Sequence, residues 1–343
     1  MRPSLTLALG LLLLATPALA GGGKGSAFKV TNLVSNQGGV AKVTDPNLVN
    51  AWGLAQGPGN APIWVSDAGS GLSTVYEQGT GQNVGLVVTI PDGAPTGIVS
   101  VPPNAGFVIS ENGKHADASF LFDSLSGVIS GWSSSVDPSN AVIAIDNSAQ
   151  GSVYTGLALD TSSNLLFAAD FANNQVQVYD STFALMNSFT DPGLPKGFAP
   201  FNVAIFNGDV YVAYAQGGGE RGVFHKPPKA SLGFVDVFSE NGTLLKQLIA
   251  GGKLDAPWGM AIAPSSFKSF GNALLVGNLD NGRINAYDIS SGKFEGTLSN
   301  KKGKPIVIDE LWALDPVPTG DITFSAGPQG YSNGLLGLIT VQK

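Results

Sequence analysis

The sequence contains no cysteine and only two histidines, His115 and His225, among its 343 residues. The lack of cysteine excludes disulfides, thiol catalysis and thiolate metal sites, and two histidines are too few for a multi-histidine metal centre. Charged residues make up only 13% of the chain, and a net charge of −7 argues against nucleic acid as a partner, because nucleic-acid binders carry a basic face. The remaining composition, 43% hydrophobic with 46 glycines, is sufficient to bury a sizeable core.

Residues 1–20 have the pattern of an export signal. Arg2 precedes an apolar run over residues 5–14, and the small-residue site Ala18-Leu19-Ala20 follows. The alternative, a membrane anchor, needs roughly 20 apolar residues, whereas this run is shorter and is followed by Pro17. We therefore expect a signal peptide over 1–20, a flexible leader over 21–27, and a single domain over 28–343 that is exported to the periplasm or the extracellular space.

Six repeated units occupy the rest of the chain. Each unit contains a short apolar strand, a turn, a second strand ending in a small or acidic residue, a Gly/Asn turn and a third strand. The first strands recur at intervals of about 44 to 59 residues, as expected for propeller blades. They are predicted over residues 52–55, 96–99, 155–158, 201–204, 258–261 and 311–314. The second strands are predicted over 63–67, 106–110, 165–170, 210–214, 274–278 and 322–326, and the third over 73–76, 118–123, 175–180, 233–238, 283–288 and 335–340.

This repetition predicts an all-β, six-bladed β-propeller. Outer fourth strands are visible in several units, for instance at residues 84–89 and 244–248. The sixth unit has none after its third strand, and the strand-like segment 28–33 precedes the first unit. We expect that segment to supply the outer strand of the last blade and so to remove an open sheet edge. Two stacked β-sandwiches are the alternative, but they would not need six equivalent units in one series.

Several motifs resemble a known family. They are Asn50-Ala51-Trp52-Gly53-Leu54, Val276-Gly277-Asn278 and the segments 256–264 and 325–328. These are similar to an uncharacterised family of exported bacterial propeller proteins, some of which carry a C-terminal PEP-CTERM sorting tail. The present sequence departs from those members because it has no such tail, and its repeats resemble NHL-type propellers more distantly. The resemblance implies a fold and an exported location, but no established activity.

The propeller topology predicts where a ligand would bind. Loops between second and third strands share a face with the connections between blades, so the polar residues of those loops are expected to gather on one rim. The candidate ligand-binding residues are Asp67, Glu111, Asn112, Asp170, Asn278 and Asp280.

Four of these, Glu111, Asp170, Asn278 and Asp280, could hold Ca²⁺ or another divalent cation, which prefers oxygen ligands. Carboxylates that share a rim without a metal would repel each other. Removing Asp170 and Asp280 should then leave metal-free stability nearly unchanged. The alternative is that Asp and Asn are turn formers that cap strand ends.

Three tryptophans, Trp52, Trp258 and Trp312, recur at the innermost strands. We expect them to pack in the core around the channel mouth rather than to stack on a ligand, because large rings fill the gaps between twisted blades. The two histidines are expected in polar loops at the surface.

Two function classes remain open. The first, which the sequence favours, is an exported monomeric binding module whose loop-rich face recognises a small molecule, a polysaccharide or a protein. The second is a divalent-metal-dependent hydrolase or lactonase with an axial acid/amide site and a carboxylate base. No complete catalytic set is identified from the sequence.

Overall fold

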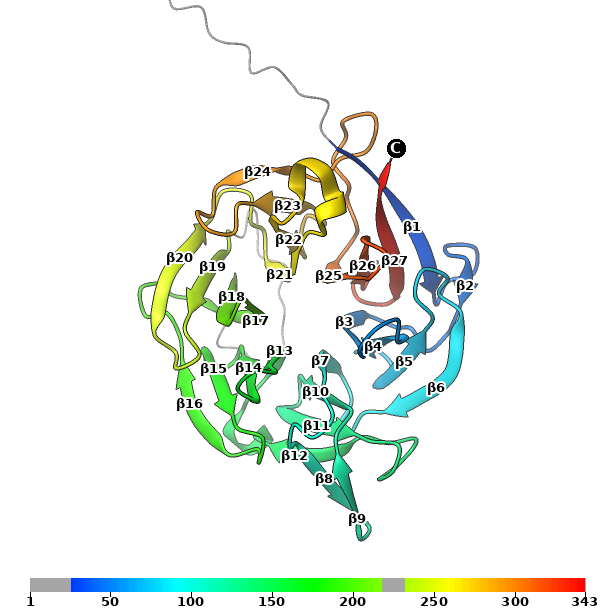
Figure 1. Ribbon diagram of the computed structural model, residues 1–343, viewed down its shortest axis with the longest axis vertical. Helices are drawn as coiled ribbons and strands as arrows, with labels where there is room; N and C mark the ends of the chain where they lie inside the picture. The colour runs from blue at the N-terminus through cyan, green and yellow to red at the C-terminus, as the bar shows by residue number, and fades with distance from the viewer. Residues whose placement is uncertain (1–25, 218–231, 343) are drawn as a thin grey trace, which may run out of the picture.

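The structure is a computed structural model that describes residues 26–217 and 232–342. Its regular elements in these ranges are β-strands and two short 3-10 helices, η1 (Ser148–Gln150) and η2 (Ser265–Phe270). Six sheets are arranged around a central axis (Figure 1), which confirms the six-bladed propeller. None of the helices in the described ranges is long and apolar enough to cross a membrane. The predicted signal peptide lies outside the described residues.

Blades 1 to 5 are four-stranded antiparallel sheets, each with its first strand next to the axis. Blade 1 contains β3 (Ala51–Gln56), β4 (Ile63–Asp67), β5 (Leu72–Tyr76) and β6 (Asn83–Thr89). Blade 2 contains β7 (Pro95–Ser100), β10 (Phe120–Ser124), β11 (Val128–Trp132) and β12 (Val142–Asp146). Blade 3 contains β13 (Tyr154–Asp160), β14 (Leu165–Asp170), β15 (Gln175–Tyr179) and β16 (Leu185–Phe189). Blade 4 contains β17 (Phe198–Phe206), β18 (Asp209–Gln216), β19 (Phe234–Phe238) and β20 (Leu244–Ala250). Blade 5 contains β21 (Pro257–Ile262), β22 (Leu274–Asn278), β23 (Ile284–Tyr287) and β24 (Phe294–Thr297).

Blade 6 joins the two ends of the chain. It contains β25 (Leu311–Pro316), β26 (Ile322–Ala326) and β27 (Leu335–Gln342), and its outer strand is β1 (Ala27–Ser35), which lies antiparallel to β27. The short β2 (Val43–Thr44) extends this sheet by pairing parallel with β1. The predicted closure by the N-terminal segment is therefore confirmed, with β1 beginning one residue inside the predicted leader.

Blade 2 differs from the prediction. The segment predicted as its second strand lies largely in β8 (Val108–Glu111), which pairs only with β9 (Lys114–Asp117) and forms a separate two-stranded hairpin. The segment predicted as the third strand is the second one, β10. The hairpin projects at the periphery of the propeller (Figure 1). The error arose because residues 106–110 have the same apolar pattern as a blade strand.

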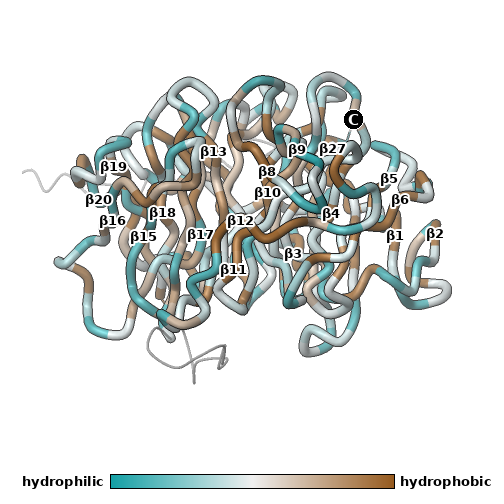
Figure 2. The backbone as a smooth tube through the Cα atoms, turned by 90° about the horizontal axis from the view of Figure 1, so that it is seen from below, coloured by the Kyte–Doolittle hydropathy of each residue, from teal (hydrophilic) through white to brown (hydrophobic). Residues whose placement is uncertain are grey.

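The hydrophobic core lies between the blades. Six clusters of buried side chains each join two neighbouring blades; for example, one packs Phe167 and Val178 of blade 3 against Val212 and Phe238 of blade 4. We call each of these contacts a seam. Second strands such as β14 are buried on both faces by two seams, so their sequences are continuous apolar runs. Figure 2 shows these hydrophobic strands between hydrophilic loops on the two faces of the disc.

Candidate functional site

The two faces of the propeller carry different loops. One face, which we call the connection face, carries the loops between second and third strands and the connections between successive blades. The opposite face carries the turns between first and second strands and between third and fourth strands. This follows from the strand registers, since Leu311 at the start of β25 pairs with Ala326 at the end of β26, and Pro316 pairs with Ile322.

Asp170 lies at the connection face but is used within its own blade. Its side chain is fully buried and accepts hydrogen bonds from Ser152 Oγ at 2.8 Å, Val153 N at 3.1 Å and both the backbone N and the Nδ2 of Asn173, at 3.3 and 2.8 Å. Ser152 and Val153 belong to the connection that leads into blade 3. The carboxylate therefore fastens this connection to the end of β14.

Asp67 and Asn278 occupy the same position at the ends of β4 and β22, and both are fully buried. Asp67 accepts a hydrogen bond from Thr74 Oγ1 at 2.7 Å, and burial raises its pKa well above the ordinary value. Asn278 donates to the carbonyl oxygen of Lys253, in the connection that leads into blade 5, at 2.8 Å. Like Asp170, these side chains bind the local backbone or a neighbouring strand.

The other predicted residues are placed differently. Glu111 and Asn112 lie at the exposed tip of the β8–β9 hairpin, at the rim of blade 2, so they do not follow a second strand as predicted. His115 is exposed on β9, and His225 lies outside the described residues. Asp280 is half-buried in the loop after β22 and lies near Tyr331, whose pKa is raised by burial first and then by the charges of Glu310 and Asp280. Residues 26–217 and 232–342 contain no group of three or more His, Asp or Glu side chains placed to hold a metal. The divalent-cation site stays a prediction.

An aromatic cluster lies on the axis towards the connection face. Trp52 stacks on Trp312 with ring centroids 3.6 Å apart, and Trp258 packs edge-on against both. The ring centroids of Phe201 and Trp312 are 6.0 Å apart. These residues come from blades 1, 4, 5 and 6, and side chains from non-adjacent blades can meet only across the axis. All four are at most 5% exposed, which confirms core packing of the three tryptophans.

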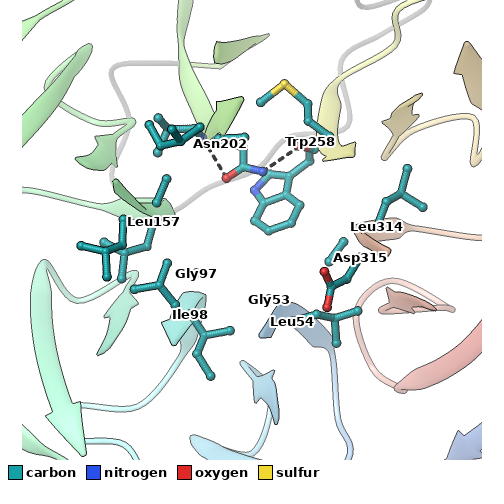
Figure 3. A pocket seen from close by; sticks show the side chains of 17 residues that line it. Gly53, Leu54, Gly97, Ile98, Leu157, Asn202, Trp258, Leu314 and Asp315 are labelled. Atoms are coloured by element: carbon teal, nitrogen blue, oxygen red, sulfur yellow. Dashed lines mark hydrogen bonds between the residues drawn. The ribbon is translucent and has the colours of Figure 1, made fainter. Parts of the chain in front are cut away.

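An axial pocket of about 250 Å³ lies between this cluster and the opposite face. The first strands of all six blades line it, mostly with glycine and aliphatic side chains such as Leu54, Ile98 and Leu314 (Figure 3). Two polar side chains belong to the lining, Asn202 and Asp315. Asn202 is occupied by hydrogen bonds to the Trp258 carbonyl oxygen at 2.8 Å and from its neighbour Val203 N at 2.9 Å. Asp315 is therefore the one carboxylate in the lining.

Asp315 lies one residue before the end of β25, at the opposite-face end of the pocket. Figure 3 shows its carboxylate directed into the channel. Gln56 Nε2 donates to Asp315 Oδ2 at 3.0 Å and to the Pro316 carbonyl oxygen at 2.8 Å, which fixes the carboxylate in this position. Burial raises the pKa of Asp315 to about 7, and the Gln56 hydrogen bond offsets part of that shift. The sequence prediction ended the first strand at Leu314 and missed this residue; its signal was an acid directly after an otherwise apolar inner strand.

The glycines of the inner strands set the width of the pocket. A Cβ on Gly53 would collide with the Thr96 carbonyl oxygen, and one on Gly97 would collide with the Leu157 backbone N. In each case the obstacle belongs to the first strand of the next blade. Glycine thus lets neighbouring inner strands approach closely, which explains the recurring Trp-Gly and Thr-Gly pairs.

Comparison with known proteins supports the fold and gives no named activity. No protein-family profile matches the sequence. The chain is similar to two proteins of Acanthamoeba polyphaga mimivirus, uncharacterized protein R648 (27% identical, covering 92% of this chain and 80% of the relative) and uncharacterized protein L690 (29% identical, covering 91% and 85%). Among solved structures it is similar to a glucose dehydrogenase, with a TM-score of 0.57 and 14% identity over 92% of this chain and all of that one. At this identity the likeness shows the propeller fold alone.

Proposed function

We propose that the protein is an exported ligand-binding β-propeller and that its ligand occupies the axial pocket. The observation that carries this proposal is the lining, in which six apolar inner strands surround one carboxylate, Asp315, directed into the space. Binding sites typically combine an apolar wall with a few placed polar groups that orient the ligand. The sequence also favours a binding module over a hydrolase.

The lining indicates the chemistry of the ligand. A cation near Asp315 would favour its ionised form, and the apolar walls around the partly buried carboxylate would strengthen the pair. The aliphatic walls suit a short alkyl chain, and a volume of about 250 Å³ admits only a small molecule. These features support a small organic cation, such as an alkylammonium ion, as the ligand class.

Isothermal titration calorimetry at pH 8 with butylammonium and, as a neutral comparison, butanol tests the proposal. We expect the wild type to bind the cation more tightly than the alcohol. The substitution Asp315→Asn should weaken cation binding at least tenfold, because it removes one partner of a desolvated charge pair. Asp321→Asn is the matched control, since Asp321 lies at the β25–β26 turn outside the pocket lining. Equal cation affinity in wild type and Asp315→Asn would contradict the proposal.

Two other hypotheses, a binding surface on the connection face and a metal-dependent hydrolase, are supported by the sequence alone. At the connection face, Asp170 and Asn278 hold the chain connections in place, so the geometry of the described residues favours the axial pocket as the site.

A further inference from the structure

A polar bridge recurs at the seams. The connection that leads into a blade places a polar group beside the third strand of that blade. There the polar group forms a hydrogen bond with a buried tyrosine or amide side chain. In blade 1, Asp45 accepts hydrogen bonds from Tyr76 at 2.9 Å and Asn83 at 2.5 Å. In blade 3, Asn147 donates to Tyr154 at 2.7 Å and Tyr179 at 2.8 Å. In blade 5, the Lys253 carbonyl oxygen accepts from Asn285 at 3.1 Å. Each bridge pairs a donor with an acceptor.

The seam between blades 3 and 4 breaks this rule because both partners are acids. Asp191 lies in the connection after β16, and Asp236 is in the middle of β19 with 0% of its surface exposed. Neither oxygen of Asp236 has a conventional donor among the described residues, and the group within hydrogen-bond reach is the Asp191 carboxyl. Two ionised carboxylates cannot hydrogen-bond each other, so this contact requires a proton.

We infer that the seam between blades 3 and 4 is a pH-sensitive joint, in which Asp191 and Asp236 share a proton that closes the seam and is released to solvent as the pH rises. The shared proton replaces the donor that Asn83, Asn147 or Asn285 supplies at the other bridges. Once it is lost, two like charges face each other in an apolar seam formed by Phe189, Phe238 and their neighbours. Two unpaired charges in this position favour opening of the seam between blades 3 and 4.

The groups around the pair support this assignment. Burial, followed by the charge of Asp191 and the hydrogen bond between the two carboxyls, raises the pKa of Asp236 to about 8. The titratable groups that face Asp236 in the described part of the chain are Asp191 and Tyr214, whose hydroxyl accepts from Asp191 N at 3.3 Å. Neither brings a positive charge. Asp191 is itself held in place, because its Oδ1 accepts from Gly193 N at 2.7 Å.

A second pair of acids spans the same two blades. Asp160 ends β13 of blade 3, and Glu240 lies in the turn between β19 and β20 of blade 4. Their mutual hydrogen bond raises the pKa of Glu240, and Asp160 Oδ2 is buried with no other partner in the described residues. A second contact between acids therefore links blades 3 and 4.

The sign of the pH effect follows from these contacts. Between the ordinary pKa of an aspartate and about 8, the folded protein holds a proton on Asp236 that the unfolded chain does not. Stability must therefore fall as the pH rises through this window, and one such group increases the unfolding constant about tenfold per pH unit. Above pH 8 the proton is gone in both states and this dependence ends.

Asp236→Asn tests the joint, because an amide can donate to Asp191 without needing a proton. We expect the unfolding constant of wild type, relative to that of Asp236→Asn, to rise about tenfold per pH unit between pH 5 and 8, measured by urea titration. The exposed Asp92→Asn is the matched control and should follow the wild type at every pH. Parallel curves for wild type and Asp236→Asn would overturn the proposal.

A second measurement does not depend on that variant folding. Difference infrared spectra at pH 6.5 and pH 9.5, recorded in an Asp315→Asn background because Asp315 titrates in the same range, should show the loss of a protonated-carboxyl band. Adding Asp191→Asn should change this band because it alters the partner. If calcium stabilises the wild type at pH 9.5 and Asp191→Asn abolishes that effect, the pair holds a metal rather than a proton and the proposal fails. A carboxyl band that is identical with and without Asp191→Asn would also overturn it.

Discussion

Asp170 illustrates how a residue type typical of binding sites can instead fasten a fold. Sequence reasoning placed it on a metal-binding rim, where its removal should leave metal-free stability nearly unchanged. The structure gives a reason to expect the opposite, because four donors from Ser152, Val153 and Asn173 converge on this buried carboxylate. Removing the acceptor would leave the buried donors of Ser152 and Val153 without a partner, whereas the exposed Asn173 could turn to water.

We therefore expect Asp170→Ala to lower the free energy of unfolding by about 3 kcal/mol or more, measured by denaturant titration in the presence of a chelator. Asp180→Ala is a suitable comparison in the same blade. Asp180 also accepts hydrogen bonds, from Thr182 and Ala184, but it is only partly buried in a surface turn, so water can replace it and a much smaller effect is expected. Equal effects of the two substitutions would show that the buried network is not important.

Residue roles could be predicted from sequence where they follow from repetition. The three tryptophans recur at equivalent positions of inner strands, and the structure confirms that they are buried. Asp315 and Asp236 could not be assigned in this way, since each occurs in only one blade. Their importance depends on what other segments place opposite them, Gln56 of blade 1 in one case and Asp191 of the connection into blade 4 in the other. No pattern within a single repeat contains that information.

At the scale of elements, strands that are buried on both faces were the easiest to predict, and blade 2 was the exception. The spacing between its first strand and that of blade 3 was the longest of the series, at about 59 residues, which leaves room for an additional hairpin. Residues 106–110 alternate like a blade strand because Phe107 and Ile109 are buried against blades 2 and 3. Burial pattern alone could not show that their partner is β9 rather than β7.

The strand β1 should be important for stability. It pairs with β27 over eight registered positions and buries Phe28, Leu33 and Val34. Deleting residues 1–35 should expose the edge of β27 and cost several kcal/mol, on the order of one strand of packing and ladder bonds. A large drop in melting temperature or aggregation is expected. A truncated protein with an unchanged melting curve would refute this role for β1.

At the scale of the whole molecule, acids with raised pKa values are distributed through the ring. Burial raises the pKa to about 6 at Asp123 in blade 2, about 8 at Asp236 in blade 4 and about 7 at Asp315 in blade 6. Asp123 accepts from Thr96 Oγ1 at 2.7 Å, so it lies where blades 2 and 3 meet the axis. Each of these acids stays protonated in the folded protein at a pH where the unfolded chain has released the proton.

The stability of the molecule should therefore be greatest in mildly acidic solution. Each of the three acids lowers the free energy of unfolding as the pH rises from about 4 to its own folded pKa, by up to about 1.4 kcal/mol per pH unit. Acids in surface turns such as Asp288, whose pKa is lowered to about 2 by hydrogen bonds from Ser291 and Ser290, act in the other direction, but only below pH 4. Melting temperatures measured from pH 3 to 9 should thus reach a maximum near pH 4 to 5 and decline steadily towards pH 8. A maximum at neutral or alkaline pH would mean that the ring accommodates these carboxylates in their charged form.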